Sequence, residues 1–355
     1  MTTRRSASPN KKGTGGIAPT TRQVSAVSAV VRWYLNLYHR TPDDPGVLSM
    51  FEDHDKVGAF AVSVADLRND EADALFRLLV AITMFQRRQD VQIMRVLRGI
   101  SAKDVGELTR PRRLLKLVDE SPCEHMRTAE SLHGKCDLAK HAITRKGRCG
   151  ANPKVLCHMK HHTVLLRRYG HFGKVPTSAA LMLREAGVGT LGGLRRKVMT
   201  SNQDPVERAH LLEEHLSRAW RVSNKIAAMF LSALCVPDLN GEEPVWGGGI
   251  DWGYFVVVDS NVDMFLKAIA YRGAWSYEAR RAFIRSISER IDLAVLRRGL
   301  ARSNPRLVQQ AMYIFMSTTN RRANPRDCMH LGPATCRRCP TLVARLCPVR
   351  RLSTA

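Results

Sequence analysis

Residues 328–347 read CMHLGPATCRRCPTLVARLC, and they place four cysteines at the spacing C-x7-C-x2-C-x7-C. The four are Cys328, Cys336, Cys339 and Cys347. Four thiolates in so short a stretch suffice for one metal centre, because a compact loop brings them together without long-range folding. Four-cysteine zinc sites commonly contain two C-x2-C pairs, whereas this segment has a single pair. Spacing alone therefore leaves zinc and an iron-sulfur cluster as open alternatives.

The chain before these cysteines predicts helices. Ser303 and Asn304 precede Pro305, which is the pattern of a helix cap followed by proline at the first helical position. Residues 75–85 carry apolar side chains at helical spacing nearly all round, as in a helix at the centre of a bundle. Residues 254–258 are almost the only stretch in which apolar and polar side chains alternate as they do in a β-strand. The sequence therefore predicts a mostly α protein.

The balance of charge points to a polyanionic partner. The chain has 355 residues, with 56 Lys and Arg against 32 Asp and Glu, and a formal charge of +24. Each phosphate that Lys or Arg neutralises releases condensed counterions, and this gain in entropy dominates non-specific affinity for nucleic acids. Nucleic acid is the favoured partner, and an anionic membrane surface is the weaker alternative. The longest apolar windows, 78–85 and 226–236, fall short of the roughly 18 residues that span a bilayer.

Residues 1–22 hold five basic residues and no acidic one, which is typical of a disordered basic arm. A mitochondrial presequence has a similar composition. No secretory apolar segment follows, so we expect a cytoplasmic or nucleoid-associated protein, with mitochondrial targeting as the alternative. Nine cysteines in an intracellular protein indicate metal ligands or free thiols before disulfides.

The cysteine spacing, placed after a helix near the chain end, resembles the iron-sulfur loop of the endonuclease III family of helix-hairpin-helix DNA glycosylases. In that family a single C-x2-C is flanked by wider gaps, which are slightly longer here. The resemblance implies a 4Fe-4S cluster held by the four cysteines of residues 328–347. Residues 222–227, VSNKIA, resemble the end of the family's hairpin, where a nucleophilic lysine opens the second helix. Residues 258–262, VDSNV, resemble the segment with the catalytic aspartate, so the resemblance assigns these roles to Lys225 and Asp259.

Together with residues 76–91 and 169–176, these matches extend over most of residues 75–347. The family's hairpin is rich in glycine because its backbone amides approach a DNA phosphate, whereas this chain has Arg221 and Ser223 in that register. The glutamine that the family inserts into the duplex falls on Arg87, between Gln86 and Gln89, so the wedge is unassigned. The residues expected to contact DNA are Arg87, Arg88, Ser223 and Asn224.

The residue types suit cleavage of an N-glycosidic bond. Positive charge develops on the sugar, and a carboxylate such as Asp259 stabilises that transition state electrostatically. A neutral amine at Lys225 can attack C1′ and form a Schiff base, whose β-elimination nicks the strand. The first turn of a helix disfavours a cation, which gives a physical reason for a reactive lysine there. The structural alternatives are that Lys225 contacts phosphate and that Asp259 caps its helix.

Aromatic side chains in and after the loop 235–253 are either stacking faces for a flipped base or ordinary core anchors. They are Trp246, Trp252, Tyr254 and Phe255.

A second group of cysteines is interleaved with histidines in a basic insertion. Its members are Cys123, Cys136, Cys149 and Cys157. These soft ligands match no compact metal motif, so a zinc ion there is the lesser alternative to free thiols.

The predicted architecture consists of two helical lobes, a helix-hairpin-helix bundle and an iron-sulfur cluster lobe, with a central cleft for DNA. Its expected parts are a disordered arm 1–22, the first part of the cluster lobe 23–70, the bundle 71–234 with an insertion at 121–162, a loop 235–254, and the rest of the cluster lobe 255–352. We expect a monomer that excises a damaged or mispaired base from double-stranded DNA, with associated lyase activity. The alternatives are a non-enzymatic iron-sulfur DNA-binding protein, structural or redox-sensing, and an electron carrier. The carrier is disfavoured because it seldom needs a charge of +24.

Overall fold

The computed structural model describes residues 17–39, 46–86, 89–121, 123–135, 174–240, 243–331 and 333–349. Helices dominate these residues and no strand occurs among them, which confirms the mostly α class. In the part of the chain so described, no helix is long and apolar enough to cross a membrane.

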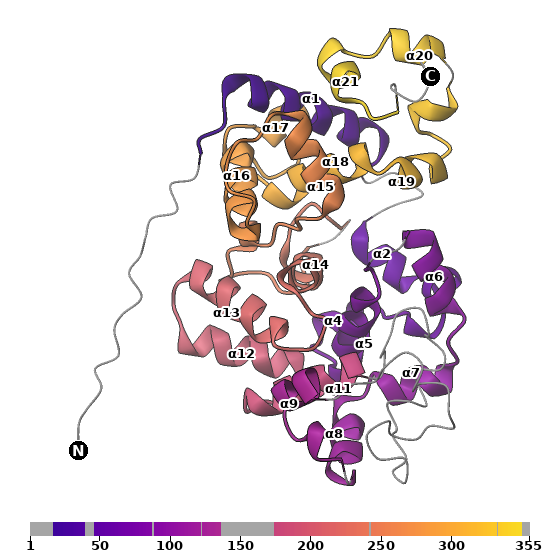
Figure 1. Cartoon of the computed structure of the whole chain (residues 1–355), viewed down its shortest axis with the longest axis vertical. Coiled ribbons are helices and arrows are strands. Elements are labelled where there is room, and N and C mark those ends of the chain that lie inside the picture. The colour runs from indigo at the N-terminus through magenta and orange to yellow at the C-terminus, as the bar shows by residue number, and fades with distance from the viewer. Residues whose placement is uncertain are drawn as a thin grey trace, which may run out of the picture.

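The helices divide between two hydrophobic cores, and Figure 1 shows the two groups following one another along the long axis of the molecule. The first group, with a small satellite cluster around Val118 and Leu132, comprises α2 (Val47–Glu52), α3 (His54–Val57), η1 (Gly58–Phe60), α4 (Val64–Arg68), α5 (Ala72–Thr83), α6 (Asp90–Arg98), α7 (Ala102–Leu108), α8 (Pro111–Asp119), η2 (Glu124–Met126), α9 (Ala129–Lys135), α11 (Lys174–Glu185), α12 (Leu191–Ser201), α13 (Pro205–Ser217) and α14 (Asn224–Cys235). The second group comprises α1 (Thr21–Leu37), η5 (Trp252–Tyr254), α15 (Ser260–Ala268), α16 (Tyr277–Glu289), α17 (Leu293–Leu296), α18 (Pro305–Met316), α19 (Thr318–Ala323), η6 (Cys328–His330), α20 (Pro333–Arg337) and α21 (Thr341–Leu346).

The first core is built around α5. Its side chains are buried on nearly every side, as the apolar pattern of residues 75–85 predicts. Phe51, Phe60 and Leu67 also pack into this core. The boundary at residue 70 expected from the sequence therefore does not separate the two cores, because the short helices α2 to α4 bury their apolar residues against α5 and its neighbours.

The second core joins the two ends of the described chain. Figure 1 shows α1 beside α15 to α18 and the C-terminal helices, and α1 makes extensive contact with α18. The start of α18 is the predicted one, since Asn304 Oδ1 accepts a hydrogen bond from the Leu307 amide at 3.0 Å and Pro305 occupies the first turn. This helix positions the residues that lead to the cysteine segment.

Residues 255–258 connect the cores and explain the alternating pattern of the sequence. Phe255 and Val257 are buried in the first core, whereas Val256 and Val258 are buried in the second. An extended chain places successive side chains on opposite faces, so this segment contacts both cores without pairing as a strand. A buried ion pair, Arg281 to Glu213 at 2.8 Å, also links α16 to α13 across the boundary.

Candidate functional site

A turn of residues 218–223 connects α13 to α14, and the two helices pack against each other. Arg221 has a φ of 62°, in the left-handed region that glycine adopts most readily. This is one of the positions where the resembled hairpin carries glycine. The Trp220 amide donates to Ser178 Oγ at 2.7 Å, and Gln86 Nε2 donates to the Arg221 carbonyl at 3.1 Å. These contacts hold the turn although it lacks a glycine.

Lys225 lies in the first turn of α14, as predicted, and is partly exposed. Ser223 is the N-cap residue, but its side chain makes no capping hydrogen bond, and the residue is exposed. Asn224 Oδ1 accepts a hydrogen bond from Ser217 Oγ at 3.2 Å, which orients its side chain back toward α13. The start of α14 thus presents a lysine and an exposed serine next to the turn.

Asp259 is the N-cap of α15, and its Oδ1 accepts a hydrogen bond from the Val262 amide at 2.9 Å. Burial raises the pKa of Asp259, while the Val262 amide and the positive charge of Lys225 act to lower it. The charge of Lys225 therefore acts on Asp259, although no salt bridge joins these two described residues. The sequence prediction placed Lys225 and Asp259 on separate helix starts, and they lie at the starts of α14 and α15, which belong to different cores. Asp259 also caps its helix, so this structural interpretation holds too.

Arg306 is a further member of this site that the sequence did not indicate. It is 6% exposed, its Nε donates to Ser232 Oγ on α14 at 3.2 Å, and its Nη1 donates to Gln309 and Gln310. Burial lowers the pKa of Arg306 to about 10, and the nearby negative charge of Asp259 acts to raise it. Among the described residues, no carboxylate forms a salt bridge with it.

A polar triad of Asp90, Tyr313 and Asn320, whose tyrosine feels the charge of Asp259, was also missed. Tyr313 Oη and Asn320 Nδ2 both donate to Asp90 Oδ2, each at 3.1 Å, and so join α18 and α19 to α6. Burial raises the pKa of Tyr313, and the negative charges of Asp90 and Asp259 act in the same direction. No sequence signal marks these residues, because Asp90 and Tyr313 are 223 positions apart.

The remaining DNA-contact and stacking predictions have mixed outcomes. Arg87 and Arg88 lie outside the described residues. Trp246 and Phe255 are buried in the first core, at 2% and 0% exposure, so they are core anchors and not open stacking faces. Trp252 and Tyr254 are partly buried and pack against the same core. Of these four aromatic residues, Trp252 also packs against the second core.

The C-terminal cysteines are partly exposed, and two of them share one partner. Arg321 is fully buried and pairs with Asp327 at 2.9 Å. Its Nη2 lies 3.2 Å from Cys328 Sγ and its Nη1 lies 3.5 Å from Cys347 Sγ. A buried guanidinium beside two thiols fits an anionic, thiolate-bound centre.

The other two cysteines of that segment, Cys336 and Cys339, are not gathered with them as ligands. No group of three or more His, Cys, Asp or Glu side chains is arranged to hold a metal ion within the described part of the chain. In the second cysteine group, Cys123 is partly buried beside the satellite cluster around Val118. Its expected partners, Cys136, Cys149 and Cys157, lie outside the described residues.

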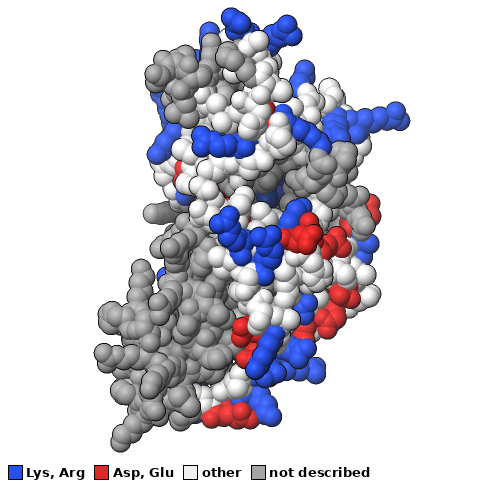
Figure 2. Space-filling model, turned by 90° about the vertical axis from the view of Figure 1, so that its right-hand side faces the viewer, with Lys and Arg blue, Asp and Glu red and all other residues white. Residues whose placement is uncertain are grey.

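Lys and Arg side chains are prominent on one face of the molecule (Figure 2). Figure 2 shows Lys and Arg on one face of the molecule, several of them around a hollow near the middle of that face. Comparison with known proteins adds no relative, since no protein-family model, curated protein or solved structure matches the chain. Function is therefore argued from the residues of this chain.

Proposed function

We propose that this protein is a DNA glycosylase that excises a damaged or mispaired base, with an associated lyase activity. The observation that supports it most is that the positive charge of Lys225 acts on the carboxyl of Asp259, whose pKa burial raises. A lysine beside a partly desolvated carboxylate is the pair that N-glycosidic cleavage through an amine requires. The net charge of +24 supports duplex DNA as the partner of a monomer.

In this mechanism Asp259 stabilises the positive charge that develops on the deoxyribose. Nζ of Lys225 attacks C1′ through its lone pair, the bond from C1′ to the base nitrogen breaks, and the base leaves with the electron pair. The amine loses its proton, the sugar ring opens, and a Schiff base forms between Nζ and C1′. β-Elimination of the 3′ phosphate then nicks the strand. Ser223, Asn224, Arg87 and Arg88 are proposed to contact the DNA backbone.

Cys328, Cys336, Cys339 and Cys347 would hold a 4Fe-4S cluster, with Arg321 beside two of the sulfurs. When bound, the cluster would supply a covalent brace for the C-terminal segment. The buried ion pair of Arg321 with Asp327 and the hydrogen bond from Tyr38 Oη to Asp327 already anchor that segment to α1. The anchored segment would help hold α18 against α14, where Arg306 bonds to Ser232. It would likewise help hold α19 against α6, where Asn320 bonds to Asp90.

The test is trapping with borohydride on a panel of duplexes, each with one damaged or mispaired base. We expect the wild type to form a covalent protein–DNA adduct on at least one duplex, and Lys225→Gln to form none. Lys267→Gln is the matched control, because Lys267 lies at the far end of α15 and should trap like the wild type. If both variants fail to form the adduct, the loss follows from removing one positive charge and not from removing the nucleophile. That outcome would contradict the assignment of Lys225.

The rival function is non-enzymatic DNA binding. The capping of α15 by Asp259 favours it, since this hydrogen bond gives the carboxylate a structural role. That rival predicts that the protein binds every duplex of the panel without releasing a base. It also predicts that Lys225→Gln binds DNA as tightly as the wild type, apart from the small loss of affinity expected from removing one positive charge.

A further inference from the structure

A cavity lies at the other end of α15 from Asp259. It has a volume of about 420 Å³, within the range of roughly 300–1,000 Å³ typical of small-molecule sites. Four elements line it: the start of α1, the end of α15 with the residues after it, α16 through Phe283, and α21. The apolar lining residues are Ile17, Ala26, Ile269, Phe283, Leu342 and Leu346.

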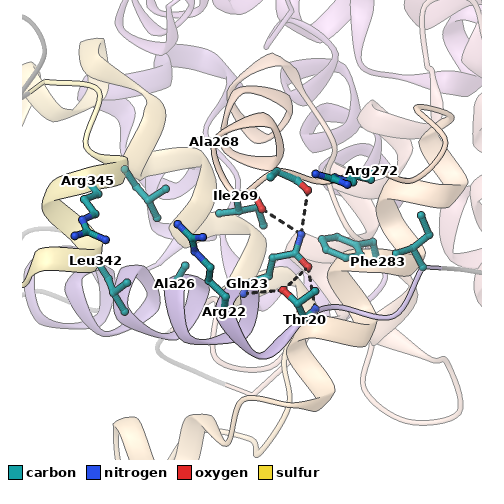
Figure 3. Close-up of a pocket in the computed structure, with 13 residues that line it drawn as sticks. Thr20, Arg22, Gln23, Ala26, Ala268, Ile269, Arg272, Phe283, Leu342 and Arg345 are labelled. Carbon is teal, nitrogen blue, oxygen red and sulfur yellow. Dashed lines mark hydrogen bonds between the residues drawn. The ribbon is translucent and has the colours of Figure 1, made fainter.

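The polar groups of the inner wall already have partners. Gln23 Nε2 donates to the carbonyls of Ile269 and Ala270, at 3.1 and 3.3 Å, and Gln23 Oε1 accepts from the Thr20 amide at 2.9 Å (Figure 3). These bonds tie α1 to the end of α15 and leave the wall between them mostly apolar. A ligand in the cavity would therefore gain chiefly by burying apolar surface.

The rim of the cavity is cationic and unopposed. Arg22, Arg272 and Arg345 line it, and in the described part of the chain none of them has a hydrogen bond or an ion pair. No Asp or Glu is among the described lining residues. Figure 3 shows Arg22 and Arg345 on the same side of the cavity and Arg272 near Phe283 at the other end. An apolar interior below three free guanidinium groups is complementary to a molecule with an apolar tail and an anionic head.

We infer that this cavity binds a small carboxylate with an unbranched apolar tail, the head beside Arg22 and Arg345 and the tail extending toward Phe283. Two other occupants are disfavoured by charge or polarity. Residues 1–16 carry four basic residues and no acidic one, so the arginines repel them. A DNA strand supplies phosphates but has no apolar group to fill the interior. This site is separate from the proposed DNA-cleaving site and does not depend on that proposal.

The first experiment measures binding of decanoate, decanol and decyltrimethylammonium to the full-length protein by titration calorimetry. We expect decanoate to bind most tightly, and each replacement of a rim arginine by alanine to weaken it about twofold to fivefold, as for exposed ion pairs. Equal affinity for decanoate and decanol, or no binding of decanoate, would overturn the inference. Displacement of decanoate by a short DNA duplex would do so too, because it would assign the arginines to phosphates.

Charge reversal gives a sharper result. The Arg22→Glu/Arg345→Glu variant should lose decanoate and gain decyltrimethylammonium. The control is Arg32→Glu/Arg298→Glu, which makes the same change in net charge at exposed arginines that do not line the cavity. If the control changes the preference as much as the rim variant does, the effect is a general one of net charge and the inference fails.

A blocking substitution tests the cavity independently of charge. Ala268 is exposed and lines the mouth, so Ala268→Trp should fill the opening without disturbing the core and should abolish decanoate binding. Ala102→Trp, at an exposed position of α7, is the matched control and should bind as the wild type does. Unchanged binding by Ala268→Trp would show that decanoate binds elsewhere and would refute the assignment.

Discussion

Asp259 offers a prediction that separates capping from catalysis. Asparagine at this position can still accept the hydrogen bond of the Val262 amide, so Asp259→Asn keeps the cap, whereas Asp259→Ala removes it. Loss of an N-cap costs about 1 kcal/mol, which corresponds to roughly 2–4 °C in Tm for a chain of moderate size. Both variants lose the carboxylate, and we expect each to lower turnover at least about a hundredfold, as for other preorganised electrostatic groups.

The raised pKa of Asp259 adds a dependence on pH. Because burial raises the folded-state pKa above the unfolded value, the folded protein binds this proton more tightly. The wild type therefore becomes more stable as the pH falls from above the folded-state pKa of Asp259 toward its unfolded-state pKa. Asp259→Asn lacks this gain in stability. At neutral pH the Asn variant should be at least as stable as the wild type.

The assay is calorimetric unfolding of wild type, Asp259→Asn and Asp259→Ala at neutral and mildly acidic pH, with single-turnover base release measured in parallel. The reasoning would be refuted if the Asn variant were less stable than the wild type at neutral pH, since burial would then not disfavour the charge. Turnover retained by the Asn variant would instead remove the catalytic role.

Two further predictions concern the contact between the cores and the cysteine segment. Replacing Arg281 by Met leaves Glu213 buried without its partner and should lower the free energy of unfolding by about 3–5 kcal/mol. The double variant Glu213→Leu/Arg281→Met should recover much of this stability. A denaturant titration in which the double variant is less stable than Arg281→Met would contradict the prediction. Cys336→Ser should abolish iron and sulfide in protein purified without oxygen, while Cys123→Ser leaves the iron unchanged; iron retained by Cys336→Ser would remove this cysteine from the ligand set.

Local features of the sequence predicted local structure well. The cap at Asn304 and the proline at 305 begin α18 where expected, and the apolar stretch 75–85 is the buried central helix of the first core. Lys225 and Asp259 were predicted at helix starts, and both lie there. These outcomes depend on backbone hydrogen bonds and apolar periodicity within a few turns of chain, which neighbouring residues largely set.

The sequence alone determined the mostly α class and the helix starts, because capping and periodicity act over short distances. The candidate pair Lys225 and Asp259 came from the resemblance of two short stretches of sequence. Only the tertiary structure showed the contacts of Arg306 and of the triad of Asp90, Tyr313 and Asn320, and only it grouped α2 to α4 with the first core. The contacts of Asp90 with Tyr313 and Asn320 join positions 223 and 230 residues apart, and that of Arg306 with Ser232 joins positions 74 apart, so neighbouring residues cannot determine them. Where the two cores meet, buried polar side chains such as Arg281 and Glu213 are removed from water and therefore pair with each other.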